Sequence, residues 1–267
     1  MSTPVVPFVP DRFQSAVPFY VAHRLRYPDT LIDEVVARVG LAAPGRVLDL
    51  GCGPGFLAIA FAGRAGEVVG MDPDAAMLAA AEAETADTAN PPRFVLGSSY
   101  DLTPKLGRFA LVTMGRSFHW MDRVATLRAL DGMIEPRGAI ALFNDGHEKC
   151  RANLWRDILE EVQKQFVDAS ASQKLRRDPE WESHSTVLLD SAFSRVERHS
   201  LIERRDLRVD EIIGRALSMS AMAPQVLGDK LGEFQKTLRE RLLAAEPSGA
   251  FQEIVEFSAI LARRPGD

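Results

Sequence analysis

The sequence predicts an α/β fold built on an open, mostly parallel β-sheet. Short apolar runs at residues 46–50 and 67–71 have the length and β-branched content of buried parallel strands. Each run is followed by a stretch whose apolar residues recur at helical spacing. Strands that alternate with helices in this way are typical of a Rossmann-like, doubly wound sheet.

The first predicted strand leads directly into a glycine-rich turn. Gly51, Gly53 and Gly55 are three glycines in five residues, so the backbone can take positive φ angles and approach a ligand closely. A helix predicted over residues 56–63 begins where the turn ends, and its free N–H groups favour an anionic ligand group. The turn is therefore predicted to bind a ligand.

The second predicted strand places an acid where a nucleoside ligand needs one. Residues 67–71 lead to Asp72, about 20 residues after the first glycine, where a carboxylate can accept hydrogen bonds from both ribose hydroxyls. Pro73 then opens a predicted helix over residues 73–84. The order of strand, glycine turn, helix, strand and acid predicts an adenosine-containing cofactor.

The residue after the last glycine distinguishes two classes of cofactor. A dinucleotide site has the pattern G-x-G-x-x-G, and here Phe56 stands in place of its last glycine. The spacing from Asp49 to Gly55 instead resembles motif I of the class I methyltransferases that use S-adenosylmethionine, and residues 68–72 resemble their motif II. The resemblance implies that Asp49 and the glycine backbone lie against the methionine part of S-adenosylmethionine, while Asp72 binds its ribose. A nicotinamide-dependent oxidoreductase is the alternative.

The N-terminal region is predicted to form helices over residues 11–23 and 30–39. The order of Tyr20, Arg24 and Tyr27 resembles the segment that precedes the core in trans-aconitate methyltransferase-like enzymes. This resemblance implies a lid over the cofactor, with Tyr20 and Arg24 near the cofactor carboxylate or the substrate and Tyr27 near the substrate. The alternative is an amphipathic helix with Tyr20 in the core and Arg24 in water.

The third predicted strand, residues 93–97, ends at Ser98 and Ser99, on the sheet edge where open α/β sheets bind ligands. Members of the family often have an acid at the position of Ser98, which accepts a hydrogen bond from the adenine amino group. A serine there makes a weaker, neutral hydrogen bond. Tyr100 is expected to pack in the core. The remaining predicted cofactor contacts are Pro73, Met77 and Met114.

The fourth predicted strand, residues 109–114, leads to an aromatic-His-Trp triplet that resembles the family's segment after motif IV. Phe118 and Trp120 are predicted to line the substrate pocket or the adenine pocket. Arg116 either binds an anionic substrate or forms a surface ion pair. His119 either hydrogen-bonds the backbone or acts as the catalytic base, and both roles stay open.

A helix over residues 121–134, a turn and a fifth strand over residues 139–143 complete the predicted core. Asn144, Asp145 and His147 are expected at the end of that strand. Their spacing fits no strong metal-ligand motif, so no metal is predicted.

Longer helical patterns follow at residues 154–166 and 181–189, and strands are predicted at residues 193–202 and 251–261. The family resemblance implies a seven-stranded sheet with a reversed last strand and a helical insertion that forms the substrate lid. The predicted parts are an N-terminal helical lid at 1–40, a cofactor-binding core at 41–146, a helical insertion at 147–192, and C-terminal strands and helices at 193–267.

The amino-acid composition limits the classes of molecule that the protein is expected to bind. The 267 residues include 32 Lys and Arg against 37 Asp and Glu, and a net charge of -5 gives no electrostatic signature of nucleic-acid binding. Two cysteines and the absence of a long apolar run favour a cytoplasmic protein without a membrane span. A small-molecule substrate and a monomer or homodimer are expected.

These observations predict an S-adenosylmethionine-dependent methyltransferase whose acceptor atom is an oxygen, in a carboxylate or a hydroxyl. Methyl transfer depends mainly on positioning, because the sulfonium leaving group is already activated. A base is needed only for an acceptor that is still protonated. The alternative from another class is a protein that binds the cofactor without catalysis, as a sensor or partner subunit.

Overall fold

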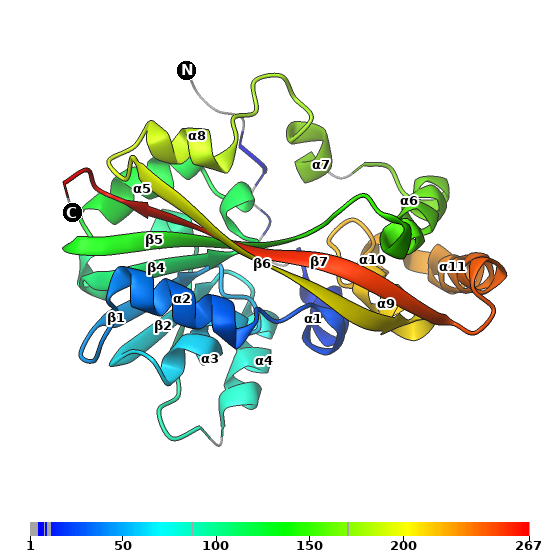
Figure 1. The fold of residues 1–267 in the computed structure, drawn as a ribbon, viewed down its shortest axis with the longest axis horizontal. Helices are drawn as coiled ribbons and strands as arrows, with labels where there is room; N and C mark the ends of the chain where they lie inside the picture. Colours follow the sequence, from blue (N-terminus) through cyan, green and yellow to red (C-terminus); the bar gives the residue numbers. More distant parts are fainter. Residues whose placement is uncertain (1–4, 8, 10–11, 87, 170, 267) are drawn as a thin grey trace.

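The computed structural model describes residues 5–7, 9, 12–86, 88–169 and 171–266. Figure 1 shows a twisted central sheet with helices on both faces and a second group of helices at one end of its longest strands. The expected start of the first helix, at residue 11, lies outside the described residues. In the described part, no helix has both the length and the apolar character that crossing a membrane requires.

The sheet has seven strands in the order β3-β2-β1-β4-β5-β7-β6. Strands β3, β2, β1, β4 and β5 are mutually parallel, whereas β7 is antiparallel to both β5 and β6. This confirms the predicted Rossmann-like sheet with a reversed last strand. The strands are β1 Arg46–Leu50, β2 Glu67–Asp72, β3 Arg93–Leu96, β4 Phe109–Gly115, β5 Ile134–His147, β6 Arg195–Arg208 and β7 Ala250–Arg263.

The helices alternate with the parallel strands as predicted. The α-helices are α1 Val17–His23, α2 Asp29–Val39, α3 Phe56–Ala62, α4 Ala75–Thr85, α5 Arg123–Asp131, α6 Leu154–Phe166, α7 Ala171–Leu175, α8 His184–Leu189, α9 Val209–Leu217, α10 Pro224–Leu227 and α11 Leu231–Ala245. The 3-10 helices are η1 Gln14–Ala16, η2 Ser99–Asp101, η3 Pro104–Leu106, η4 Phe118–Trp120, η5 Arg151–Asn153 and η6 Gly228–Lys230.

The two faces of the sheet carry separate hydrophobic cores. On one face Val47 packs in a cluster with α2 and α3, and on the other face Leu48 packs with α5 and α8. Successive residues of a strand point to opposite faces, so a strand covered on both sides must be apolar throughout. This explains why the parallel strands could be recognised as continuous apolar runs.

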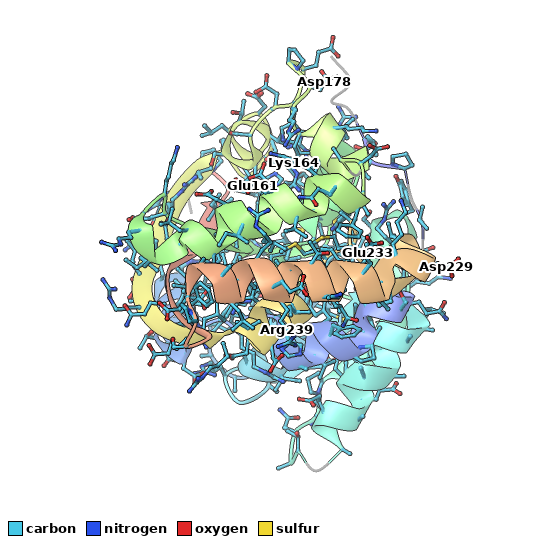
Figure 2. The ribbon with its side chains drawn as sticks, turned by 90° about the vertical axis from the view of Figure 1, so that its right-hand side faces the viewer. Glu161, Lys164, Asp178, Asp229, Glu233 and Arg239 are labelled. Atoms are coloured by element: carbon cyan, nitrogen blue, oxygen red, sulfur yellow. The ribbon has the colours of Figure 1, made fainter. Side chains whose placement is uncertain are left out.

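A third core lies beyond the carboxyl ends of the parallel strands. Leu207 of β6 and residues of α6, α9 and α11, including Trp155, Ile212 and Leu238, form one buried cluster. Figure 2, which looks at this end, shows α6 and α11 running alongside each other, with Glu161 and Lys164 of α6 labelled. We call this part, built from the far halves of β5 to β7 with α6, α9, α10 and α11, the helical cap.

The packing corrects two of the expected part boundaries. The predicted lid at 1–40 includes α2, but Ile32 and Val35 of α2 are completely buried in the core of the sheet. The predicted insertion at 147–192 is divided, because α6 packs with α11 in the helical cap and α8 packs against α5 and β6. Helix α2 therefore belongs to the core of the sheet, and residues 147–192 contribute to two separate parts of the fold.

Strand β5 is longer than predicted. The preceding helix ends at Asp131 and the strand begins at Ile134, and its pairing with β4 is irregular between Phe109 and Leu111. Beyond the end of β4, β5 continues because β7 pairs with it as far as His147. Asn144, Asp145 and His147 therefore lie within a strand, and not after its end as expected.

Candidate active site

A cavity lies at the carboxyl ends of β1, β2 and β4, where the glycine turn was predicted to bind its ligand. We call it the cofactor cavity. Its lining includes ten residues with predicted site roles: Tyr20, Gly51, Gly53, Asp72, Pro73, Met77, Ser98, Ser99, Arg116 and Trp120. Chain segments that are far apart in the sequence therefore converge on one site.

The glycine turn leaves space for a ligand against its backbone. Gly51 has a φ of 69°, and a Cβ added there would lie 2.6 Å from the Cβ of Ser117, so only glycine fits beneath that residue. Gly53 has a φ of 53°, and a Cβ there would meet only the Sδ of Met77, at 4.0 Å. A side chain at Gly53 would instead occupy the cavity, so the turn fits a ligand that contacts its backbone closely.

Asp72 connects the glycine turn to the second strand. Its Oδ2 accepts a hydrogen bond from Gly53 N at 2.8 Å, and its Oδ1 accepts from Asp74 N at 2.9 Å. Burial raises the pKa of Asp72 to about 6, although both backbone hydrogen bonds act in the opposite direction. Each carboxylate oxygen has a further lone pair, so Asp72 can still accept hydrogen bonds from ribose hydroxyls, as predicted.

We expect the affinity for an adenosine cofactor to fall below neutral pH. In its predicted role the ionised Asp72 would accept hydrogen bonds from the ribose hydroxyls, so below a pKa of about 6 the free protein would have to lose a proton before it binds. Affinity for S-adenosylmethionine should therefore be about tenfold lower at pH 5 than at pH 7. Calorimetric titration with S-adenosylmethionine between pH 5 and pH 7 measures this change in affinity.

Asp72→Asn is the matched control, because the amide keeps the shape of the side chain but has no proton to lose. Burial also raises the pKa of Asp49, to about 7, so a residual slope in Asp72→Asn would report Asp49. An affinity that stays constant from pH 5 to pH 8 in the wild-type protein would contradict the assignment of Asp72.

Asp74 is a cavity residue that the sequence reading did not identify. Its Oδ1 caps α4 by accepting from Ala76 N at 2.9 Å, whereas its Oδ2 is buried and has no partner among the described residues. The cap could have been inferred from an acid at a helix start. The orientation of the second oxygen could not, because it depends on how the helix sits against the cavity.

After β3, where the family resemblance predicts contact with adenine, the position of the acidic residue differs from the expected pattern. Asp101 accepts hydrogen bonds at 2.8 Å from both the N–H and the hydroxyl of Ser98. The acid that is missing at position 98 is thus found three residues later, where it fixes the orientation of Ser98. Tyr100 was expected in the core, but it is 58% exposed and lines the cavity, because a short 3-10 helix turns it outward.

Asp49 lies beneath the glycine turn and not in the cofactor cavity. Its Oδ1 accepts from the hydroxyl of Thr113 at 2.9 Å, and its Oδ2 accepts from Ala58 N at 3.1 Å. It lines a small cavity beneath the turn together with Tyr27, which packs against Phe143 in the core. Gly55 caps α3 in the left-handed conformation. Asp49 and Gly55 therefore shape the turn, and Tyr27, like them, does not line the cofactor cavity.

Arg116 lines this small cavity, whereas Arg24, a predicted cofactor contact, lines neither it nor the cofactor cavity. The carboxylate of Asp145 acts electrostatically on both arginines. Arg116 has a positive φ of 56° and donates to Asp145 Oδ1 at 2.5 Å. Arg24 lies over the ring of Tyr20 at 5.2 Å, its pKa is lowered by burial, and its Nε has no partner in the described part of the chain. Among the described residues, the two arginines therefore have one nearby carboxylate between them, that of Asp145.

A second cavity adjoins the first and shares Arg116 and Ser117 with it. We call it the adjoining cavity. Its lining includes Phe118, which was predicted to line a substrate or adenine pocket, and His119, the candidate base. Met114, a predicted cofactor contact, lines this cavity instead of the cofactor cavity. The lining residues that the sequence reading missed include Arg176, His184 and Arg198. They come from the segment after α7, from α8 and from β6, and no local motif marks them.

His119 is a poor candidate for a strong base. Burial lowers its pKa well below the ordinary histidine value, and nearby Arg176, His184 and Arg123 lower it further. Its ring lies 4.6 Å from that of Trp120. A neutral His119 can orient an acceptor by a hydrogen bond, but it competes weakly for a proton.

Two of the three polar residues expected at the end of the fifth strand, Asp145 and His147, are engaged in ion pairs or hydrogen bonds. Asp145 bonds to Arg116, and His147 Nε2 lies 2.9 Å from Glu253 Oε2. Among the described residues, no group of three or more His, Cys, Asp or Glu side chains is arranged to hold a metal ion.

Residues 47–138 match the model of a family described as a methyltransferase domain. The match runs from β1 through the glycine turn and Asp72 to the segment that contains His119 and Trp120. These residues therefore match a methyltransferase domain, in agreement with the predicted resemblance to the class I methyltransferases.

Known proteins resemble parts of the chain in sequence and nearly all of it in fold. Trans-aconitate 2-methyltransferase of Methylobacterium radiotolerans is 35% identical over 112 residues, so this chain spans 41% of that curated relative, and the match covers 41% of this chain. A Geobacter sulfurreducens methyltransferase solved with S-adenosyl-L-homocysteine matches with a TM-score of 0.51 and 17% identity over 94% of this chain and 98% of its own.

The [4+2]-cyclase SpnF matches with a TM-score of 0.57 and 13% identity over 99% of both chains. At such low identity, both structural matches show the fold alone. Because a cyclase shares this fold, the sequence match and the site residues are what point to methyl transfer.

Proposed function

We propose that this protein transfers the methyl group of S-adenosylmethionine to a carboxylate oxygen of a small anionic molecule. The main support for an anionic acceptor is the set of residues that line the adjoining cavity. Arg116, Arg176 and Arg198 line it together with His119 and His184, and none of its described lining residues is acidic. A cavity with this lining favours an anion and disfavours an amine.

The position of this cavity supports its role as the acceptor site. Arg116 and Ser117 form a wall common to both cavities, at the carboxyl end of β4. A cofactor in one cavity would therefore reach an acceptor in the other. The hydroxyl of Ser117 donates to Leu50 O at 2.8 Å, which fixes this wall to the strand before the glycine turn.

The state of His119 favours a carboxylate over a phenol or an alcohol. A carboxylic acid with a pKa of about 4 is ionised at neutral pH and needs no base, whereas a phenol near 10 must lose its proton. Because the pKa of His119 lies well below the ordinary value, this residue is badly matched to the second task. The name of the Methylobacterium relative, which refers to trans-aconitate, supports the same acceptor class.

The residues of this chain would act by binding and orienting the two reactants. S-adenosylmethionine supplies an electrophilic methyl group on a positively charged sulfur. The glycine turn and Asp72 hold the nucleoside part, and Arg24 and Arg116 balance the carboxylate of the methionine part. Arg176 and Arg198 of the adjoining cavity turn the acceptor carboxylate toward Arg116 and Ser117. Such positioning alone can lower the barrier by about 7 to 11 kcal/mol.

Arg198→Met should raise the KM for an acidic acceptor about tenfold, because a charge-assisted hydrogen bond contributes about 1.5 kcal/mol or more. The affinity for S-adenosylmethionine should not change, since Arg198 lies outside the cofactor cavity. Steady-state kinetics with the best acid from a panel of mono-, di- and tricarboxylic acids measures the KM. Calorimetry measures the affinity for S-adenosylmethionine.

Arg205→Met is the matched control, since Arg205 is an exposed arginine on the same strand, β6, and does not line the adjoining cavity. Equal KM values in wild type and Arg198→Met would contradict the assignment of this cavity. Methylation of amines but of no acid in the panel would contradict the proposed acceptor class.

A further inference from the structure

Arg123 occupies an unfavourable position for a cation. It is the first residue of α5 and is 2% exposed, and positive charge is disfavoured at a helix N-terminus. Among the described residues no direct ion pair of Arg123 is found, although the Glu182 carboxylate acts on it electrostatically, and its Nη2 is buried without a partner there. A buried arginine without a direct ion pair needs another explanation.

The other contacts of Arg123 explain why an arginine is buried at this position. Its Nη1 donates to the backbone oxygen of Glu182 at 2.6 Å, and its guanidinium carbon lies 3.7 Å from the ring centre of Trp181. Arg123 thus fixes residues 181–184, which enter α8, against the end of α5. This segment brings His184 to the wall of the adjoining cavity.

The same guanidinium determines which nitrogen of His184 carries the proton. Arg123 Nη1 lies 3.3 Å from His184 Nδ1. Because a guanidinium only donates hydrogen bonds, Nδ1 must accept, and the proton of the neutral ring is then on Nε2. Burial and the nearby Arg123 and Arg176 lower the pKa of His184 to about 4, so its ring is neutral at pH 7.

The ring of His184 is held in place from two further sides. Phe118 meets it edge to face with 5.2 Å between ring centres, and His119 stacks on it at 6.5 Å with 18° between the ring planes. Both neighbours also line the adjoining cavity. With Nδ1 turned to Arg123, the Nε2 edge of the ring is left to donate elsewhere.

We infer that His184 binds the acceptor by donating its Nε2–H to an anionic oxygen, and that Arg123 is the positioning residue that fixes this tautomer. The inference rests on the proposed function for the identity of the acceptor. The assignment of the tautomer does not, since it follows from the contact of Arg123 with the ring.

Nitrogen-15 NMR of the protein with labelled histidine tests the tautomer without any acceptor. Two-bond nitrogen–proton correlations should show His184 with a proton on Nε2 and none on Nδ1. Arg123→Met should give a mixture of tautomers, and Arg128→Met, an exposed arginine of the same helix, should leave the spectrum unchanged. A proton on Nδ1 in the wild-type protein would overturn the inference and leave the proposed function standing.

Kinetics test the role in acceptor binding. His184→Phe keeps a ring against Phe118 but has no donor, so the KM for the best acid should rise about tenfold with kcat close to wild type. His184→Gln places an amide N–H near the position of Nε2 and should restore most of the KM. An unchanged KM in His184→Phe, or the same loss in both variants, would overturn the inference. A wild-type protein that methylates no acid would overturn the proposed function instead.

Discussion

Asp72→Ala should abolish measurable binding of S-adenosylmethionine. The carboxylate has two tasks: it is predicted to accept the ribose hydroxyls, and it accepts hydrogen bonds from Gly53 N and Asp74 N that shape the turn. Each charge-assisted hydrogen bond contributes about 1.5 to 3 kcal/mol, so losing two ribose contacts should weaken binding at least about a hundredfold. Calorimetry with S-adenosylmethionine and S-adenosylhomocysteine measures the loss.

Glu82→Ala is the control for this variant. Glu82 is an exposed acid on α4, the helix that follows Asp72, and it does not line the cofactor cavity. Its removal should leave the affinity unchanged. Tight binding of the cofactor by folded Asp72→Ala would show that the ribose is held by other residues, and Asp74 would be the next candidate.

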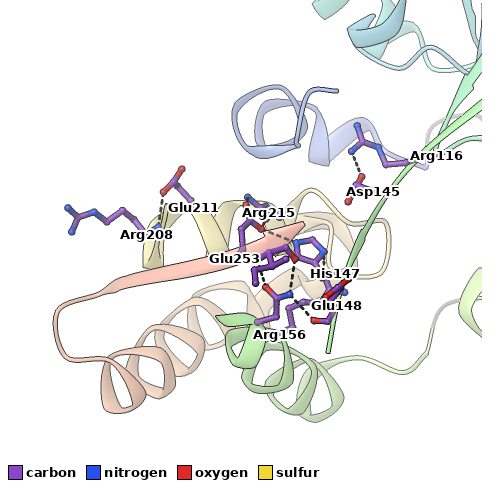
Figure 3. A network of polar contacts seen from close by, with 11 residues as sticks. Arg116, Asp145, His147, Glu148, Arg156, Arg208, Glu211, Arg215 and Glu253 are labelled. Carbon is purple, nitrogen blue, oxygen red and sulfur yellow. Dashed lines mark hydrogen bonds and ion pairs between the residues drawn. The ribbon is translucent and has the colours of Figure 1, made fainter. Parts of the chain in front are cut away.

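Glu253→Gln should cause a large loss of stability. Figure 3 shows Glu253 of β7 between His147 of β5 and Arg215 of α9, with Arg156 of α6 on the other side of His147. Glu253 Oε2 accepts from Arg215 Nη1 at 2.6 Å and lies 2.9 Å from His147 Nε2. Removing one partner from a buried pair leaves the other charge uncompensated, which costs about 3 to 5 kcal/mol.

For a chain of this size, that loss should lower the melting temperature by roughly 10 °C. Glu240→Gln is the matched control, because Glu240 pairs with Lys236 at the surface with 66% of its side chain exposed. Such pairs contribute about 0 to 1 kcal/mol. Equal melting temperatures for the two variants would contradict the structural role of the buried network.

The pH dependence of this network has a defined sign. Burial acts to raise the pKa of Glu253, but the hydrogen bonds from His147 and Arg215 outweigh it, and the net pKa is lowered. A carboxyl group whose pKa is lowered by folding stabilises the fold above its ordinary titration range, and that contribution is lost as the pH falls through the lowered pKa. The difference in stability between wild type and Glu253→Gln should therefore shrink in acid.

The parallel half of the sheet could be predicted from the sequence because both of its faces are buried. Apart from Asp49, residues 47–50 and 68–71 are apolar or glycine, and the two runs are followed by glycine and by aspartate. The order of the strands could not be obtained from spacing, and the reversed β7 came only from the family resemblance. The full length of β6 was missed because its outer half mixes charged and apolar residues over the helical cap, whereas β7 was predicted to within two residues at each end.

The residues of the candidate site also fall into two groups, those that could be predicted from the sequence and those that could not. The glycine turn and Asp72 could be found because their roles depend on backbone conformation and on the ends of strands, which leave local signals. His184 and Arg198 could not, because they reach the adjoining cavity through the packing of α8 and β6 on the sheet. Residues brought together only by tertiary structure leave no pattern in a single sequence.

The most direct test of the account is methyl transfer to an acid. The protein is incubated with S-adenosylmethionine labelled in the methyl group and with the panel of carboxylic acids, and the products are separated and treated with mild base. The account predicts a labelled methyl ester that base hydrolyses, formed in equal amount to S-adenosylhomocysteine. Label in a base-stable product, or cofactor binding without transfer to any acid, would contradict it.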